Sequence, residues 1–361
     1  MPDGSMVCFT IANNKEKMSK WNLFRRMRSD VSIVQTIKND DTYLELCALV
    51  ERMKKSTWKR SDVNFEGDAR SFSKLNNLEQ NIIFMTSGFF LTIDSVVMDS
   101  LNNSLVKDLE LLSRKNKQLK KALEFYVEQN RHEEVHDEFY KDMGKTHFPH
   151  SYDTVLKRCH EDFLEFKKVF DFCRRFQQRK RPLGERLFAY ALIECIVFFP
   201  FFAAIIRHRF SGNIPSTVSG NHWVCNEEAM HVLGHSCIFK LVGGVSDSQA
   251  KKICDELVFL VKDMWTSRIL RYGENDVNGF TLVMVCEYID DLSEFMLGLT
   301  GFKEPRVMKS PFRYMNYLQS YTRANFFETR VIEYDALHDV NYHDGVFNNS
   351  KELKACKEYF Y

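Results

Sequence analysis

Residues 187–206 read LFAYALIECIVFFPFFAAII, an apolar run with a single carboxylate, Glu194, near its middle. Arg186 and Arg207 flank the run, and its length would suffice for a membrane span. A lone carboxylate at bilayer depth is costly without a partner, however, and Pro200 follows it. We find no second run of this length in the chain. We therefore expect a central helix that is buried on all sides by other helices, with no membrane partner.

The remainder of the chain also predicts helices. Only 7 Pro and 15 Gly occur in 361 residues, and apolar residues recur mostly with the period of 3.6 that is typical of α-helices. We predict an all-α protein with a poorly patterned N-terminal extension (1–40), a helical domain (41–320) and a flexible C-terminal tail (321–361). The predicted helices span roughly 42–57, 75–103, 105–143, 152–178, 183–209, 219–243, 247–271 and 276–299, with further candidates at 310–320 and 325–334.

The composition excludes several classes of protein. Apolar residues make up 44% of the chain, which rules out a disordered protein. The formal net charge of +1 argues against nucleic acid as the main partner, because phosphate binding usually needs a basic excess. The ten cysteines form no C-x-x-C pair, and the first 14 residues lack the pattern of a secretory signal. We expect a cytoplasmic protein without a disulfide scaffold.

Two acids occupy positions that helical geometry would bury. Asp94 lies in FFLTIDSVVMDSL (89–101), with apolar residues three and four positions away on both sides. Glu194 has apolar neighbours on its face apart from Tyr190, which could donate one hydrogen bond but cannot neutralise the charge. Since no Lys or Arg shares these faces, a bound metal ion is the simplest explanation for both acids.

Two further helices supply metal ligands at matched spacing. Glu133 and His136 form Glu-x-x-His in RHEEVHDEFY (131–140), and Glu228 and His231 repeat the motif in CNEEAMHVLGH (225–235). The i, i+3 spacing places Glu and His on one helical face. One acid from each of two helices plus Glu-x-x-His from each of two others is the arrangement of ferritin-like di-iron and di-manganese bundles. Such mixed ligands favour iron or manganese over a structural zinc site.

A purely structural alternative stays open at this point, in which the two buried acids pair with Tyr or Arg groups from elsewhere and both Glu-x-x-His motifs are solvated. Other histidines fit the pattern less well. His132 lies off the face of His136, His235 has no matching acid, and His147 and His150 flank a proline and predict a loop.

Five segments, in the correct order, resemble the radical-generating small subunit of class I ribonucleotide reductase. The matching segments are FFLTIDSVVMDSL (89–101), EEVHDEFY (133–140), ECIVFFPFFAAII (194–206), NHWVCNEEAMH (221–231) and NFFETRVIEY (325–334). The resemblance implies a ferritin-like bundle with a di-iron centre that uses O2 to form a tyrosyl radical. It also implies a homodimer and a separate large subunit, bound through the C-terminal tail, that reduces ribonucleoside diphosphates.

The resemblance assigns roles to individual residues. Tyr140 takes the position of the radical-forming tyrosine, four residues after His136. The other matches are the ligands of one iron (Asp94, Glu133, His136), the ligands of the other (Glu194, Glu228, His231), the apolar pocket (Phe198, Phe202, Val224) and the radical-transfer residues (Trp58, Glu227, Tyr334).

The chain also departs from the family pattern. Glu227 replaces an Asp, Asn226 replaces an Arg, Pro200 replaces a Gly, and the chain ends in EYFY rather than in an acidic, Phe-terminated sequence. The interval from the first acid to the first Glu-x-x-His is longer by about two helical turns, which the polar residues 113–121 would explain. Two alternatives therefore remain: another ferritin-like oxidase, and a metal-poor relative that regulates a true small subunit. The ligands do not distinguish iron from manganese.

Overall fold

The computed structural model describes residues 40–56, 58–100, 104–270 and 279–315, without the side chains of residues 40, 94, 95, 99 and 100. The C-terminal tail, the candidate helix at 325–334 and nearly all of the N-terminal extension lie outside the described residues.

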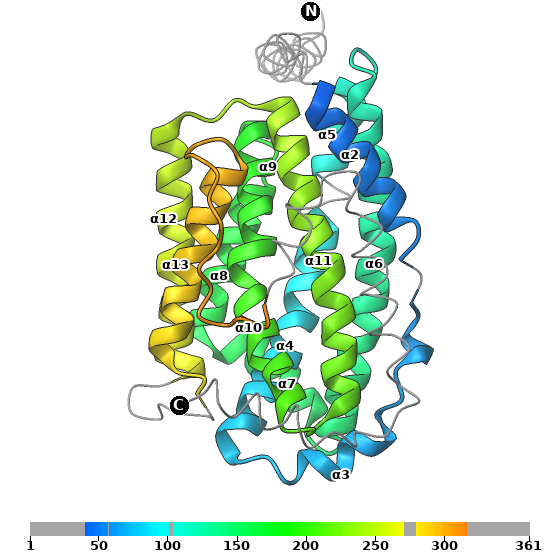
Figure 1. Ribbon diagram of the computed structural model, residues 1–361, viewed down its shortest axis with the longest axis vertical. Helices are drawn as coiled ribbons and strands as arrows, with labels where there is room; N and C mark the ends of the chain where they lie inside the picture. Colours follow the sequence, from blue (N-terminus) through cyan, green and yellow to red (C-terminus); the bar gives the residue numbers. More distant parts are fainter. Residues whose placement is uncertain (1–39, 57, 101–103, 271–278, 316–361) are drawn as a thin grey trace, which may run out of the picture. The chain divides into compact units, whose positions relative to one another are not determined.

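The described elements are helices, which confirms the predicted all-α class (Figure 1). The α-helices are α2 (Asp40–Met53), α3 (Asp68–Phe72), α4 (Asn77–Ser100), α5 (Val106–Ser113), α6 (Gln118–His147), α7 (Tyr152–Lys157), α8 (Leu164–Gln177), α9 (Leu183–Leu192), α10 (Phe199–Ile206), α11 (Pro215–Val242), α12 (Asp247–Met264) and α13 (Leu282–Leu299). Short 3-10 and π-helical turns connect several of them.

A four-helix core consists of α4, α6, α11 and the α9–α10 segment. Helix α11 packs against α9, α6 and α10, while α4 packs against α6. Glycine allows α11 to approach α6 closely: a Cβ atom at Gly234 would lie 2.0 Å from the Phe125 ring, and one at Gly220 would lie 2.1 Å from the Phe139 ring. The two helices that carry the Glu-x-x-His motifs are therefore held at short range.

The apolar run at 187–206 is buried within the bundle, as expected for a central helix. It is not one regular helix, because a π-helical turn at Ile193–Val197 separates α9 from α10. Pro200 lies at the second position of α10, where a missing backbone N–H removes no hydrogen bond of a regular helix. The expectation that the chain has no second run of this kind was wrong: Asn77–Met98 is also long and apolar enough to span a membrane, and it too is mostly buried.

Three predicted helices differ from the structure. The predicted helix at 105–143 is two helices, α5 and α6, which separate within the polar stretch noted above. The prediction at 152–178 is interrupted at Phe163, between a π-helical turn and α8. Residues 310–315 of the candidate helix at 310–320 are not helical.

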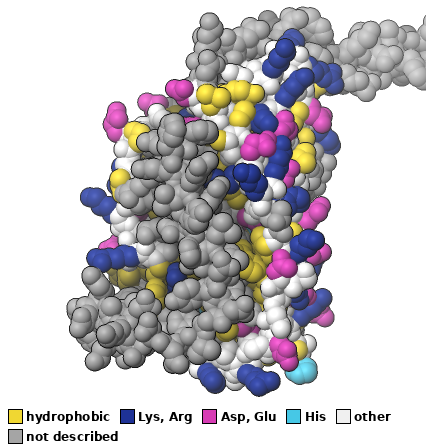
Figure 2. All heavy atoms as spheres, turned by 45° about the vertical axis from the view of Figure 1, so that its right-hand side comes forward, with side chains coloured by type: hydrophobic (Ala, Val, Ile, Leu, Met, Phe, Trp, Pro, Cys, Tyr) yellow, Lys and Arg dark blue, Asp and Glu magenta, His cyan; other side chains and the backbone are white. Residues whose placement is uncertain are grey.

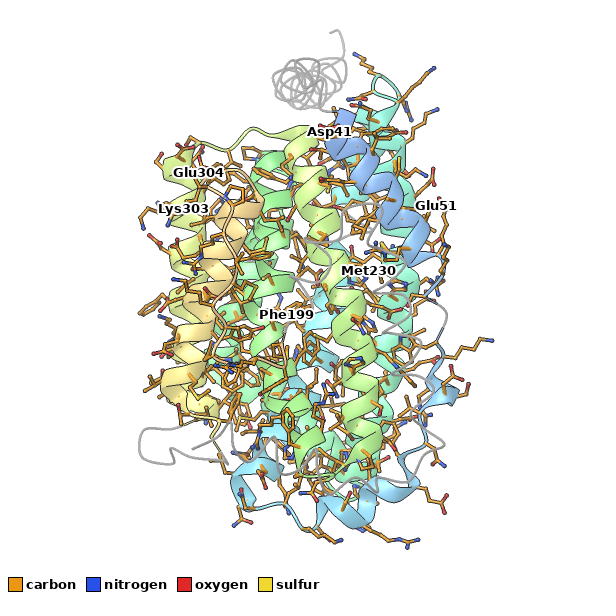
Figure 3. The ribbon with its side chains drawn as sticks, in the orientation of Figure 1. Asp41, Glu51, Phe199, Met230, Lys303 and Glu304 are labelled. Carbon is orange, nitrogen blue, oxygen red and sulfur yellow. The ribbon has the colours of Figure 1, made fainter. Side chains whose placement is uncertain are left out.

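Helices α12 and α13 pack together and cover α8 and α9 on the outer side of the bundle (Figure 1). The side chains of Phe199 and Met230 mark the buried interior, whereas Glu51 and Lys303 lie at the outer surface (Figure 3). Acidic and basic side chains are interspersed on the visible face of the described residues, in keeping with the balanced charge (Figure 2).

Candidate metal centre

The structure brings together the predicted ligands whose side chains it describes. Glu133, Glu194, Glu228 and His231 are each at most 1% exposed, and one ligand atom from each lies within 4.8 Å of the others. Helices α6 and α11 and the π-helical turn after α9 supply these groups. Asp94 is on α4, but its side chain lies outside the described residues.

The two motif histidines face the same two carboxylates. The Nδ1 atom of His136 lies 3.3 Å from Glu133 Oε2 and 3.3 Å from Glu228 Oε1. The Nδ1 atom of His231 lies 3.0 Å from Glu228 Oε2 and 3.3 Å from Glu133 Oε1. Each imidazole therefore presents Nδ1 to the interior of the cluster and Nε2 to its outside.

The charges of the cluster are strongly coupled. Burial alone would raise the pKa of Glu133, but the adjacent imidazoles of His136 and His231 outweigh it and lower that pKa. Burial alone would lower the pKa of His231, but the Glu228 and Glu133 carboxylates raise it to about 9. Protons on the imidazoles thus neutralise carboxylates that a cation could neutralise instead.

The donor set fits a metal pair. The buried His136 Nδ1 makes no well-aligned hydrogen bond, although two carboxylate oxygens lie 3.3 Å away. A buried nitrogen that points into a group of carboxylates without a hydrogen-bond partner is what a metal ligand requires. Mixed carboxylate and imidazole donors suit iron or manganese.

Gln129, which the sequence analysis missed, connects two of the acids. Its Nε2 donates to Glu194 Oε1 at 3.0 Å and to Glu133 Oε1 at 3.2 Å. Its position four residues before Glu133 on α6 was the available signal. His235, for which the sequence analysis found no matching acid, has its Nε2 3.8 Å from Glu194 Oε1, beyond hydrogen-bond distance. The ring of Tyr190 stacks on this histidine.

Tyr140 is fully buried beside the cluster. Its hydroxyl donates to Asn221 Oδ1 at 3.1 Å, and its ring stacks on Phe90 with centroids 4.5 Å apart. The predicted pocket residues Phe198 and Phe202 contact the other parts of the same Phe90 ring, with centroids 5.2 and 5.4 Å away. The predicted pocket is therefore built around Phe90, to which the sequence analysis gave no role in the pocket. The third predicted pocket residue, Val224, is buried on α11.

Trp58 and Glu227 meet on one side of the cluster. The indole Nε1 donates to Glu227 Oε2 at 2.9 Å, and His136 Nε2 lies 2.8 Å from the same oxygen. Ser56 donates to Glu227 Oε1 at 2.5 Å. Glu227, which stands where the family pattern has the shorter Asp, therefore reaches both Trp58 and His136. Tyr334 lies outside the described residues.

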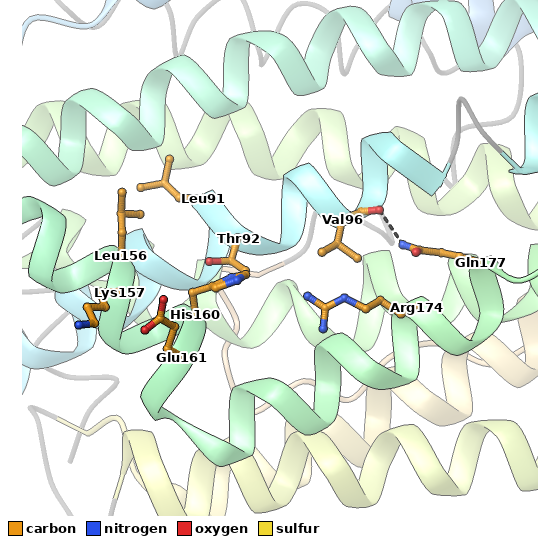
Figure 4. A pocket seen from close by; sticks show the side chains of 9 residues that line it. All are labelled: Leu91, Thr92, Val96, Leu156, Lys157, His160, Glu161, Arg174 and Gln177. Atoms are coloured by element: carbon orange, nitrogen blue, oxygen red, sulfur yellow. Dashed lines mark hydrogen bonds between the residues drawn. The ribbon is translucent and has the colours of Figure 1, made fainter.

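A surface pocket of about 600 Å³ lies apart from these residues, against the outer sides of α4, α7 and α8 (Figure 4). Leu91 and Val96 are among its apolar lining, and Lys157 and Arg174 are among its charged lining. Gln177, also in the lining, donates to the backbone oxygen of Val96 at 2.7 Å. The predicted site residues are absent from the described lining, so we do not assign the chemistry to this pocket.

Known proteins are similar to this chain in sequence and in fold. The ribonucleoside-diphosphate reductase small chain of Vaccinia virus (strain Western Reserve) is 24% identical over 307 residues, which cover 85% of this chain and 93% of the viral one. The fold is similar to the ribonucleotide reductase Rnr4 homodimer of Saccharomyces cerevisiae, with a TM-score of 0.61 and 20% identity over 83% of this chain and 88% of the yeast chain. It is also similar to the dimanganese(II)-NrdF of Streptococcus sanguinis, with a TM-score of 0.58 and 14% identity over 79% of this chain and 97% of that chain.

These neighbours confirm the predicted ferritin-like bundle. The sequence pattern of the family described as "Ribonucleotide reductase, small chain" matches residues 38–305, about three quarters of the chain. This protein therefore belongs to the ribonucleotide reductase small-chain family.

Proposed function

We propose that this protein is the radical-generating small subunit of a ribonucleoside-diphosphate reductase. The main observation in support is a cluster of buried carboxylates and imidazoles, together with a buried tyrosine, Tyr140, that lies in an aromatic pocket one helical turn after His136. A family member that lacked metal chemistry would have no physical reason to bury three acids side by side.

Six residues would hold the metal pair. Asp94, Glu133 and His136 would bind one ion, and Glu194, Glu228 and His231 would bind the other. A metal pair held by these residues would supply the oxidising power, drawn from O2, for converting Tyr140 to a radical. Two iron ions are our first choice; a manganese or mixed centre is chemically compatible, and the similar NrdF of Streptococcus sanguinis is a dimanganese protein.

The chain itself protects and orients Tyr140. Asn221 Oδ1 accepts a hydrogen bond from the Tyr140 hydroxyl, which fixes the direction of that hydroxyl. Phe90 covers the Tyr140 ring, and Phe198 and Phe202 pack against Phe90 in turn, so this fully buried ring is kept from water and external reductants.

Trp58, Glu227 and Tyr334 would carry the oxidising equivalent onward to a large subunit. The contacts of Glu227 with Trp58 and His136 support this route, because they form an unbroken hydrogen-bonded connection from the cluster toward the loop after α2. The large subunit would bind through the C-terminal tail, reduce ribonucleoside diphosphates and supply deoxyribonucleotides for DNA replication. We place the protein in the cytoplasm as a homodimer; the yeast neighbour is a homodimer.

The decisive experiment loads metal-free protein with Fe(II), adds O2 and measures metal content, the visible spectrum and the electron paramagnetic resonance spectrum of one sample. Two irons per chain with a tyrosyl radical signal would support the proposal. Two irons without a radical, and again none with manganese, would favour another ferritin-like oxidase. Protein that binds no metal and co-purifies with another small subunit would favour a regulatory relative.

The partner assignment has a separate test. A chain truncated before Tyr334 should still bind metal and form the radical, but should not support nucleotide reduction by the large subunit. Reduction that survives truncation would overturn the role of the tail.

A further inference from the structure

His132 is a buried histidine on α6 that lies between the metal centre and Glu227. It is 1% exposed, and its Nδ1 lies 3.2 Å from His231 Nε2. Its Nε2 lies 3.3 Å from the backbone oxygen of Met53 and 3.4 Å from Glu227 Oε1. The sequence analysis placed His132 off the face of His136 and gave it no role, whereas these contacts place it against the proposed ligand His231.

The hydrogen bonds of His132 have a defined direction when His231 binds a metal. His231 turns Nδ1 toward Glu228 and Glu133, so a metal bound there leaves its single proton on Nε2. His231 Nε2 then donates, and His132 Nδ1 must accept.

The other nitrogen of His132 is then the donor. A neutral imidazole that accepts at Nδ1 carries its proton on Nε2, which faces Met53 and Glu227. Arg131 Nη2 approaches this nitrogen at 3.1 Å, but its two N–H groups already donate to the backbone oxygens of Met53 and Ser56, at 2.9 and 2.8 Å.

Both motif histidines thus converge on Glu227. His136 reaches Oε2 directly at 2.8 Å, whereas His231 reaches Oε1 through His132. The ring of His132 also stacks on that of His231, with centroids 5.4 Å apart and planes inclined by 24°, so packing restrains the pair as well.

We propose that His132 is a positioning residue that fixes the orientation and tautomer of His231 and ties the second metal position to Glu227. The proposal rests on the proposed function, because it takes His231 as a metal ligand. It places the hydrogen bond between Trp58 and Glu227 in one network of polar contacts with both metal positions, in which His132 Nε2 bonds to the Met53 oxygen and lies 3.4 Å from Glu227 Oε1.

The test compares three substitutions of His132 in the full chain. His132→Leu removes both hydrogen bonds, His132→Asn keeps an acceptor near the place of Nδ1, and His132→Gln keeps a donor near the place of Nε2. Anaerobic Co(II) titration, followed by visible absorbance, reports the affinity of each metal position. We expect the Leu and Gln variants to weaken one of two sites by about 10–100-fold and the Asn variant to restore it.

His147→Leu is the matched control. His147 is also a buried α6 histidine with a side-chain partner, Thr217 at 2.8 Å, but it has no contact with the cluster among the described residues. This variant should bind Co(II) like the wild type. In Zn(II)-loaded protein labelled with 15N-histidine, the His231 Nε2–H signal should be protected from exchange in the wild type and lose that protection in His132→Leu.

Each outcome separates the two proposals. Wild-type protein that binds fewer than two metal ions overturns the proposed function, and this inference with it. Wild-type protein that binds two, with an equally tight His132→Leu variant, overturns the role of His132 alone. If His132→Leu does not fold, equal affinities in the Asn and Gln variants overturn it.

Discussion

Trp58 and Glu227 are 169 positions apart in the chain, and a hydrogen bond of 2.9 Å joins the indole Nε1 of the first to Oε2 of the second. That oxygen also lies 2.8 Å from His136 Nε2. A single carboxylate oxygen therefore links the loop after α2 to a ligand of the proposed metal centre.

Shortening this carboxylate should interrupt the link. Asp is one methylene shorter than Glu, so Glu227→Asp cannot keep both contacts without moving α11. Loss of one hydrogen bond to a charged group costs about 1.5–3 kcal/mol, so nucleotide reduction with the large subunit should fall by roughly 10–100-fold. Metal content should not change. Glu134→Asp, at an exposed site on α6, is the control, and unchanged activity in Glu227→Asp would contradict the proposed route.

Removing the hydroxyl of Tyr140 should abolish the radical without disturbing the fold. Phe at this position keeps the stacking on Phe90 and loses the hydrogen bond to Asn221. After Fe(II) and O2, metal analysis should still find two irons per chain, and the electron paramagnetic resonance spectrum should show no tyrosyl signal. Tyr126→Phe removes another buried hydroxyl from α6 and should leave the signal intact. A radical in Tyr140→Phe would refute the assignment.

The close approach of α6 and α11 predicts a stability difference between two glycines. Gly234→Ala would place a methyl group 2.0 Å from the Phe125 ring, and overpacking of this kind costs about 1–3 kcal/mol of unfolding free energy. Gly67→Ala meets no atom within 4 Å and should be neutral or slightly stabilising. Chemical denaturation of both variants measures the difference, and equal stabilities would argue against a tight helix contact.

His147 should make the protein sensitive to acid. Burial lowers its pKa to about 4, below the usual value of about 6.5, so the unfolded chain binds a proton first as the pH falls. The contribution of neutral His147 to the unfolding free energy is fully present above about pH 6.5 and is lost as the pH falls toward 4. His147→Gln removes this titratable group. Between about pH 6.5 and pH 4, the unfolding free energy of the wild type should therefore drop by about 2–4 kcal/mol more than that of the variant. Parallel curves would show that His147 is not the cause.

The helical fold and the clustering of the motif residues could be predicted from the sequence because periodicity and spacing are local properties. A run of 20 apolar residues with one acid predicts a buried helix wherever it lies, and the i, i+3 spacing places Glu133 and His136 on one face in any α-helix. The breaks within predicted helices were missed because apolar periodicity continues across them. Residues 114–117 separate α5 from α6, and their polarity was the only sequence signal for this break.

The groups around the ligands could not be read from one helix at a time. His132 lies off the face of His136, yet α11 and the end of α2 converge there and supply His231 and the backbone oxygen of Met53 as partners. His235 was set aside for want of an acid on its own helix, although the acid comes from another helix, as Glu194. Partners from distant segments are a tertiary property, for which one sequence without a fold holds no signal.

Because of the π-helical turn at Ile193–Val197, the number of residues in this segment matters more than which apolar residues they are. A π-helical turn holds one residue more than a regular turn, so it acts as a one-residue insertion absorbed within the helix. Deleting any residue of the turn other than Glu194 would restore the regular repeat and remove the local widening that sets the direction of Glu194. Exchanges among apolar residues should be tolerated in this stretch during evolution, whereas single-residue deletions should be eliminated.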